Sequence, residues 1–305
     1  MKNFTKISVL ILMGLSNHQP TMNGLFVLFL LIYLVTLIIN LLVFILIVID
    51  HHLHNPMYFF LSNLAFLDMS YSSVTAPRML FDLITKSASI TIPACTTQIF
   101  VFLFLAASEL LLLSAMSYDR YVAVCHPLHY QQIMSWKVCL HLTFVIWPLA
   151  FSYSMFHTLF LLRLSFCGTS SIHNFFCDLP HLFQISCTDP TINIVVMLIL
   201  GGCFSLPAFL FTFLPYVCIF CTILRIRDNS GKLKAFSTCT SHLMVVFIFY
   251  ISIIFIYLVP TSSNMFGMNR FFSVMYSLIN PLLNPLIYSL RNADLKTAFK
   301  RTVKC

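Results

Sequence analysis

The chain has 305 residues, of which 59% are hydrophobic and 9% are charged, and its mean hydropathy is +0.92. Soluble domains carry about 25% charged residues, so this composition excludes a water-soluble fold; it also excludes disorder, which requires low hydrophobicity. The net charge of +8 comes from 17 Lys and Arg against 9 Asp and Glu. Because the basic residues lie between apolar stretches, this charge favours contact with an anionic membrane leaflet over contact with nucleic acid.

Residues 1–23 are expected to form a retained, extracellular N-terminal tail. Lys2 and Lys6 precede a short apolar run, Ile7–Leu15, which resembles the core of a signal peptide, but no small-residue cleavage site follows it. Asn3 begins an Asn-Phe-Thr sequon, which can be glycosylated only if the tail lies outside the cell.

Seven apolar stretches follow, each long enough to cross a bilayer as a helix, which takes about 20 residues. They are Gly24–Ile49, Met57–Leu80, Ile92–Met116, Val138–Leu162, Ile192–Leu224, Ala235–Val259 and Phe271–Leu290. We therefore predict an all-α membrane protein with one domain, residues 1–305. Residues 24–290 form a seven-transmembrane helix bundle, and residues 291–305 form a cytoplasmic tail with a short amphipathic helix.

The distribution of Lys and Arg predicts the orientation. One set of connecting segments contains eleven of them and the opposite set contains six. Since the richer set lies in the cytoplasm, the N-terminus is predicted to be extracellular and the C-terminus cytoplasmic, in a multi-pass protein of the plasma membrane.

Four of the 11 cysteines fall in segments predicted to be extracellular: Cys95, Cys167, Cys177 and Cys187. An even number in an oxidising compartment indicates two disulfides, and spacing leaves three connectivities open. His173 and His181 lie in the same long segment, so a metal site is an alternative; disulfides explain the cysteines more simply.

Polar residues deep in the apolar stretches indicate a functional centre. Asp68 and Glu109 are acidic, and Asn40, Asn280 and Asn284 lie at similar depth in the first and last stretches. Ionisable groups inside a membrane are costly and mark functional sites by default. We interpret the five as one cluster that holds a cation, a water network or shared protons. The alternative is that each only joins neighbouring helices by hydrogen bonds.

Five motifs occur in order along the chain: Leu53–Leu64, Met116–Tyr130, Phe175–Asp178, Lys234–Leu243 and Pro281–Asn292. In combination they resemble the vertebrate odorant receptor family of the rhodopsin-like G-protein-coupled receptors. The resemblance implies a receptor without enzymatic activity that binds a small volatile ligand and activates a heterotrimeric, olfactory-type stimulatory G protein, which raises cyclic AMP. It implies no cofactor or metal beyond a sodium ion or water cluster at Asp68 and Glu109, membrane lipid as a partner and no nucleic acid.

The resemblance also assigns roles to residues. It implies that Cys95 pairs with Cys177 and that Cys167 pairs with Cys187. The five polar residues match the family's central sodium-like site. The implied activation switch consists of Asp119, Arg120, Tyr216, Tyr250, Asn284, Pro285 and Tyr288.

Several positions depart from the family pattern, among them the run Gln131–Met134, which differs from the usual proline-containing run. Ile39 stands where a glycine usually precedes the asparagine of the first helix, and Pro215 stands where a serine usually precedes Tyr216. Asn174 occupies the histidine position of a metal motif proposed for some odorant receptors, with His173 one residue earlier, so metal-assisted ligand binding is not expected.

A ligand pocket is expected in the extracellular half of the bundle, between the third, fifth, sixth and seventh helices. Helical spacing places thirteen residues on the faces turned toward it: Phe102, Leu103, Ala106, His157, Gly201, Phe204, Ser205, Ile253, Ile254, Tyr257, Ser273, Val274 and Ser277. Since none of them is acidic, the set disfavours a charged amine. It favours a small neutral molecule oriented by one hydrogen bond from Tyr257, Ser205, Ser277 or His157.

Three other functions also use a bundle of apolar helices. A transporter or channel with an ion path at Asp68 and Glu109 would show an internal repeat or broken helices, and an intramembrane enzyme would need a nucleophile beside a base or paired metal ligands. The sequence carries neither pattern. A seven-helix receptor for a non-odorant small molecule stays as the alternative.

Overall fold

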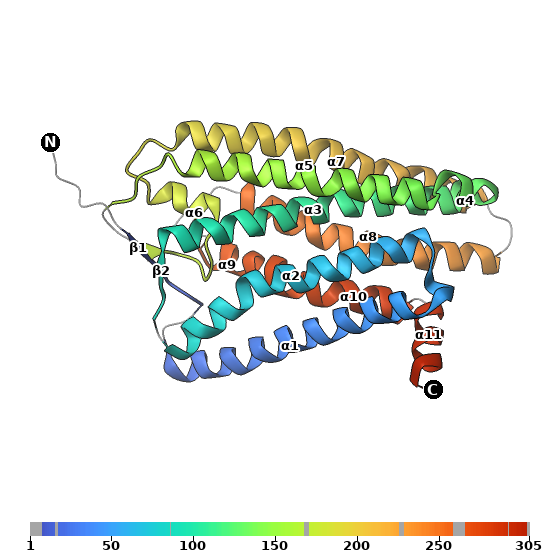
Figure 1. Ribbon diagram of the computed structural model, residues 1–305, viewed down its shortest axis with the longest axis horizontal. Helices are drawn as coiled ribbons and strands as arrows, with labels where there is room; N and C mark the ends of the chain where they lie inside the picture. The colour runs from blue at the N-terminus through green and yellow to red at the C-terminus, as the bar shows by residue number, and fades with distance from the viewer. Residues whose placement is uncertain are drawn as a thin grey trace.

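The computed structural model describes residues 8–15, 18–85, 87–167, 171–225, 229–258, 266–291 and 293–303. The predicted glycosylation site, Asn3, lies outside these ranges. In the described chain, seven long helical segments run along one common axis (Figure 1). They are α1 (Gln19–Ile49), α2 (Pro56–Thr85), α3 (Ile92–Cys125), α5 (Trp136–Leu161), α7 (Thr191–Arg225), α8 (Asn229–Tyr257) and a last helix made of α9 (Phe266–Val274), the π-helical turn η4 (Met275–Ile279) and α10 (Asn280–Arg291).

Short elements connect these helices. Three short strands pair at one end of the bundle. At the other end the short helix α11 lies across the direction of the long helices (Figure 1). The short elements are β1 (Val9–Leu12), η1 (His51–Leu53), β2 (Ser89–Thr91), η2 (Pro127–His129), α4 (Tyr130–Ile133), β3 (Ser171–Ile172), α6 (Leu179–Gln184) and α11 (Ala293–Val303). We call the two ends of the bundle the sheet end and the α11 end.

The predicted all-α, seven-helix fold is confirmed. Five helices are long and apolar enough to cross a membrane by length and composition: α1, α3, α5, α7 and the Cys239–Tyr257 part of α8. The other two are α2, which carries three charged residues, and the last helix, which η4 divides. Pro281, which has no N–H to donate, is the second residue after η4, and such prolines favour local departures from α-helical spacing.

Side-chain caps set several helix starts. The side chain of Asn55 accepts a hydrogen bond from the backbone N–H of Tyr58 (3.2 Å), and Pro56 opens α2. The side chain of Thr91 accepts one from the backbone N–H of Ala94 (3.4 Å) at the start of α3. These contacts satisfy backbone donors that a helix start leaves free.

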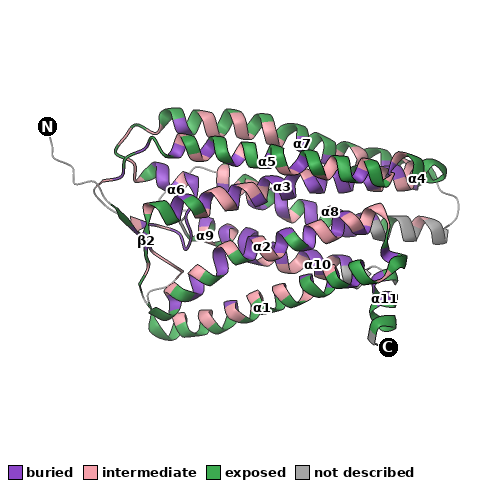
Figure 2. Cartoon of the chain, in the orientation of Figure 1, coloured by how far each residue is buried: buried purple, intermediate pink, exposed green. Residues whose placement is uncertain are grey.

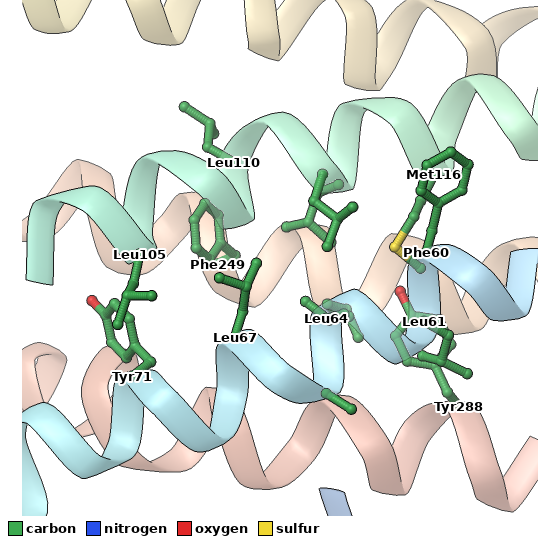
Figure 3. Packing of buried hydrophobic residues seen from close by; sticks show 14 of the residues in the cluster. Phe60, Leu61, Leu64, Leu67, Tyr71, Leu105, Leu110, Met116, Phe249 and Tyr288 are labelled. Carbon is green, nitrogen blue, oxygen red and sulfur yellow. The ribbon is translucent and has the colours of Figure 1, made fainter. Parts of the chain in front are cut away.

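The bundle buries α3 and exposes α7 (Figure 2). In the most apolar stretch of each helix, 72% of the residues of α3 are buried but only 6% of those of α7. Leucine and aromatic side chains from α2, α3, α8 and α10 fill the core, including Leu64, Leu105, Phe249 and Tyr288 (Figure 3). An apolar surface this extensive is stable only against lipid.

At the sheet end, β1 lies between β2 and β3, antiparallel to β2 and parallel to β3. Leu10 and Leu12 are buried whereas Val9 and Ile11 are exposed, as alternation along a strand requires. The structure thus places a strand and the first turn of α1 within residues 1–23, which the sequence analysis treated as a tail.

Two disulfides hold the segment that precedes α7. Cys95, near the start of α3, is joined to Cys177, and Cys167 is joined to Cys187. The first links the sheet end of α3 to the segment that begins α6. The second closes a loop with a sequence separation of 20 residues. Together the two disulfides restrict the movement of the segment between α5 and α7, which covers this end of the bundle.

Leu10→Ala should destabilise the receptor far more than Ile11→Ala, although the two residues are neighbours on β1. Leu10 is fully buried, and removal of a buried leucine side chain costs about 2–5 kcal/mol; Ile11 is exposed. The measurement is thermal unfolding of the purified receptor, and equal losses for the two variants would contradict the described packing of β1.

Candidate functional site

A cavity of about 470 Å³ lies between α3, α5, α7 and α8, toward the sheet end. This volume falls within the range of small-molecule sites, which are mostly apolar with a few placed polar groups. The lining consists of Leu103, Ala106, Ala107, Leu110, Tyr153, Leu179, Met197, Leu198, Gly201, Gly202, Phe204, Ser205, Leu206, Phe209, Tyr250, Ile253, Ile254, Tyr257, Leu258 and Tyr276. None of these residues carries a charge, and the polar groups are hydroxyls.

Eight of the thirteen predicted pocket residues line this cavity. They are Leu103, Ala106, Gly201, Phe204, Ser205, Ile253, Ile254 and Tyr257. The helical spacing used to select them holds for α3, α7 and α8, because each of these helices is regular at that depth.

Phe102 is absent from the cavity lining and belongs to an aromatic cluster with residues of α2, of η4 and of the loop before α6. Its ring centroid is 4.7 Å from that of Tyr71, 4.9 Å from Phe176 and 5.6 Å from Tyr276. The side chain is buried against α2 and the last helix, so it supports the wall without facing the cavity.

The three predicted residues of the last helix also lie outside the lining, which contains Tyr276 in their place. The Ser277 hydroxyl donates to the Ser273 carbonyl (2.7 Å), and the Ser273 hydroxyl accepts from the Asn174 side chain (3.2 Å). Val274 packs against the main core. The turn η4 begins at Met275, and its wider spacing changes which residues face inward.

Tyr153, which the sequence analysis did not select, stands between His157 and the cavity. Its ring centroid is 4.5 Å from that of Phe204, stacked, and 4.6 Å from that of His157, edge-on. His157 is buried and lies outside the lining. Tyr153 is four residues before His157 on the same helix face, so the spacing that selected His157 also pointed to this tyrosine.

A hydrogen bond over the sheet end of the cavity joins α8 to the loop before α6. The Tyr257 hydroxyl donates to Asp178 Oδ1 (3.1 Å), and the same oxygen accepts from the backbone N–H of Leu179 (2.8 Å). Burial raises the pKa of Asp178 to about 6. Since Leu179 lines the cavity, the position of α8 is coupled to the cover of the cavity.

The predicted polar centre lies beyond the cavity, toward the α11 end. The Asn284 amide donates to Asp68 Oδ1 (2.9 Å) and to Glu109 Oε1 (3.3 Å), which ties α10 to α2 and α3. The Asn40 amide donates to the Pro281 carbonyl (3.0 Å), which ties α1 to the same helix beside Asn280. The five predicted residues are therefore buried in one region of the bundle.

Several oxygens of the polar centre have no hydrogen-bond partner among the described residues. They are Asp68 Oδ2, Asn40 Oδ1 and Asn280 Oδ1, all buried. Carboxylate and amide oxygens are the ligands that hard cations prefer, and buried polar atoms without a partner often bind water. The residues present therefore fit a monovalent cation or ordered water.

Four of the seven predicted switch residues, Asp119, Arg120, Tyr216 and Tyr288, lie toward the α11 end of the bundle. Arg120 forms an ion pair with Asp119, which also accepts a hydrogen bond from the Tyr130 hydroxyl (2.7 Å). Tyr216 and His242 are hydrogen-bonded to each other across α7 and α8, and the rings of His242 and Tyr288 lie 6.2 Å apart. Tyr130 and His242 were not among the predicted switch residues, although they lie in the motifs Met116–Tyr130 and Lys234–Leu243.

Tyr250 lies between the cavity and this switch. It lines the cavity, and its hydroxyl is hydrogen-bonded to the Thr212 hydroxyl (3.4 Å). Thr212 is in turn hydrogen-bonded to Ser114 of α3 (2.9 Å). This contact series joins α8, α7 and α3 at the floor of the cavity. Pro285 follows Asn284 within α10.

The fold is that of the seven-helix receptors. The crystal structure of squid rhodopsin superposes with a TM-score of 0.64 over 94% of this chain and 86% of that chain, at 17% sequence identity. This similarity defines the fold class: an all-α bundle of seven helices with the arrangement seen in squid rhodopsin.

The chain belongs to the olfactory receptor family. The family model for olfactory receptors matches residues 29–304. Human olfactory receptor 1C1 is 41% identical over 305 residues, which cover all of this chain and 97% of the relative, and rat olfactory receptor 1 is 45% identical over 300 residues, which cover 98% and 96%. The expected resemblance is thus confirmed, and the chain is a multi-pass odorant receptor that couples to a G protein.

The stability conferred by Asp178 should depend on pH. Its pKa is raised from 3.8 to about 6 in the folded protein, so the folded state binds the proton more tightly than the unfolded state. The contribution is present below about pH 4 and is lost as the pH rises through about 6. Relative to Asp178→Asn, which stays neutral, the wild type should lose thermal stability across this interval.

The other titrating groups are present in both proteins, so their contributions to stability cancel in the difference in Tm between wild type and variant. One is His181, whose pKa burial lowers to about 4 and whose contribution has the opposite sign. A difference in Tm between wild type and variant that stays constant from pH 4 to pH 7 would contradict the buried position of Asp178.

Proposed function

We propose that this receptor binds a small, neutral, volatile odorant in the 470 Å³ cavity and activates an olfactory-type stimulatory G protein, which raises cyclic AMP. The observation that carries the proposal is the lining: it is apolar and aromatic, and its polar groups are hydroxyls. Ser205 and Tyr257 of the lining are candidate hydrogen-bond partners of the ligand, and Tyr153 joins them. The other five predicted pocket residues support the lining without contacting the ligand: Phe102, His157, Ser273, Val274 and Ser277.

The proposed orientation places the sheet end outside the cell and the α11 end in the cytoplasm of a cell with the receptor in its plasma membrane. The two disulfides at the sheet end support it, because an oxidising compartment favours such bonds. Arg225, Lys296, Lys300 and Arg301, at the other end, fit the cytoplasmic bias of basic residues. In this arrangement Asn3 is available for glycosylation, and the single domain extends over residues 1–305.

The proposed mechanism is a shift between two populations. A ligand shifts them only to the extent that it binds the active arrangement better. Its contacts with Tyr250 bias the series through Thr212 to Tyr216, Tyr288 and the Asn284–Pro285 segment. Arg120 leaves Asp119 as the α11 end of α8 moves outward, and the resulting cleft accepts the G protein.

We also propose a sodium ion or a water cluster at Asp68 and Glu109. The unpartnered oxygens of the centre support it, and a cation there would offset two carboxylates that share one Asn284 amide. Membrane lipid is the other proposed partner; the apolar outer surface supports it, and the basic residues suit anionic headgroups rather than nucleic acid.

An odorant screen in cells that carry the tagged receptor at their surface tests the function. A neutral odorant should raise cyclic AMP, and Arg120→Ala should abolish the response. Tyr257→Phe removes the hydrogen bond to Asp178 and should shift the half-maximal concentration about tenfold, because hydrogen bonds to charged groups contribute about 1.5–3 kcal/mol.

Tyr33→Phe is the matched control, since its hydroxyl bonds to Ser73 on the far side of the bundle (3.0 Å). It should leave the response unchanged. A surface-expressed receptor that ignores a broad panel of neutral odorants but responds to another small molecule would overturn the odorant assignment.

Sodium should stabilise the receptor through Glu109. A sodium concentration about ten times Kd adds about 1.4 kcal/mol to the free energy of unfolding, so the Tm of the wild type should rise when N-methylglucamine chloride is replaced by sodium chloride. Glu109→Gln should remove this rise. Asp82→Asn is the control and should keep it, because the Asp82 carboxylate pairs with Arg78 (2.9 Å) away from the polar centre. A rise of equal size in Glu109→Gln would rule out a sodium ion at this centre.

A further inference from the structure

The residues that line the cavity differ sharply in exposure. Six are exposed: Leu198, Gly202, Leu206 and Phe209 of α7, and Ile254 and Leu258 of α8. Leu206 is 60% exposed and Leu258 63%, whereas Leu103 is 5% and Tyr276 1% exposed. Since Leu103 and Tyr276 also face the cavity, contact with the cavity does not by itself expose a side chain. The six residues therefore also face the outside of the bundle.

These exposed residues form two stripes at helical spacing. On α7 the positions 198, 202, 206 and 209 follow intervals of four, four and three, and on α8 the positions 254 and 258 are four apart. Residues at such intervals share one face of a helix. Each helix thus presents one edge that borders both the cavity and the lipid-facing surface, and the two edges define a slit.

The slit is closed toward the α11 end. There the ring of Tyr250 lies 5.4 Å from Phe209 and 5.5 Å from Phe213, and its hydroxyl bonds to Thr212. Between Phe209 and the sheet end, no hydrogen bond or ring contact joins α7 to α8 in the part of the chain that the structure describes. The side chain of Tyr257 is bonded to Asp178 instead.

The cavity is covered toward the sheet end by described residues. Leu103 and Leu179 of the lining belong to a hydrophobic cluster that includes Leu10 and Leu12 of β1. The Cys95–Cys177 disulfide holds this cover to α3. The described cover is packed and cross-linked, while the side between α7 and α8 is bordered by exposed apolar residues.

We propose that the slit between α7 and α8 is a lateral entrance through which a small, neutral, apolar ligand passes from the lipid bilayer into the cavity. This inference rests on the proposed function for the identity of the ligand. The chemistry suits the route: apolar molecules concentrate in the bilayer, and every residue of the two edges is apolar. A charged or strongly polar molecule would find no partner along it.

Gly202 allows the entrance to be blocked by one substitution. A Cβ atom at this position would meet nothing within 4 Å, so Gly202→Trp should place a large side chain in the slit with the backbone intact. The adjacent Cys203 is exposed and lies outside the cavity lining. Cys203→Trp is therefore the matched control: the same side chain, on the same helix, on a face that does not border the cavity.

The test uses 3-trifluoromethyl-3-phenyldiazirine, a neutral photoreactive molecule of odorant size, with purified receptor in phosphatidylcholine vesicles. Vesicles preloaded with the probe are mixed with the receptor vesicles, and a light flash follows after varied delays. Mass spectrometry then measures labelling of the α3 segment Leu103–Leu110, which borders the cavity. Labelling should rise about tenfold more slowly in Gly202→Trp than in wild type, which is one decade of rate. In Cys203→Trp it should match wild type, and in Leu206→Ala it should be faster.

All four proteins should reach the same final labelling, because a change at the entrance alters rate and not occupancy. Equal rates in Gly202→Trp and wild type would overturn the proposal in favour of a route through the sheet end, as would cavity residues that stay unlabelled in wild type. A lower final level in Gly202→Trp would also overturn it, because it would show that position 202 faces the inside of the cavity and does not border a slit. The readout needs no G protein, so it is independent of whether an odorant raises cyclic AMP.

Discussion

The hydrogen bonds from the Asn284 amide to Asp68 and Glu109 are the interaction on which the rest of the structure depends. Inside a bilayer no water competes for polar groups, so such groups must find partners within the bundle. One amide therefore fixes α10 against α2 and α3 at the same depth. The Asn40 bond to the Pro281 carbonyl adds α1 to this centre. Three of these helices, α2, α3 and α10, contribute to the packed core, whereas α7, which carries none of these groups, stays at the surface.

This arrangement gives the two ends of the receptor different properties. Toward the sheet end, the space between α3, α7 and α8 is left open as the cavity, and the disulfide-linked cover closes over it. Toward the α11 end, Arg120 is held by Asp119, and Tyr216 by His242. Tyr250 lines the cavity and is hydrogen-bonded to Thr212. A ligand that repositions Tyr250 acts on α8, which carries none of the five residues of the polar centre.

Much of this could be predicted from the sequence, because the bilayer imposes simple rules. Apolar stretches of sufficient length identified the seven helices, and the cost of buried charge identified Asp68 and Glu109. Regular helical spacing placed Leu103, Phe204 and Ile253 at the cavity. Prediction succeeded where one local rule, either hydropathy or a period of 3.6 residues, decides the outcome.

The remaining features depend on contacts that the sequence does not specify locally. The turn η4 changes the inward face of the last helix, so Tyr276 faces the cavity where Ser273 and Ser277 were expected. Strand β1 is stable only because β2 and β3, far away in the sequence, offer pairing partners. Phe102 shares the apolar character of its neighbours, and only the aromatic cluster around it determines which way it packs.

The central claim is that ligand in the cavity opens the α11 end by moving α8 relative to α3. Spin labels at Leu128, which follows α3 and is 93% exposed, and at Phe236 of α8 report that distance directly. Electron paramagnetic resonance in lipid nanodiscs should show a second, longer distance when an odorant that raises cyclic AMP is added. The longer distance should stay absent with a non-activating odorant. An unchanged distance distribution with the activating odorant would contradict the account.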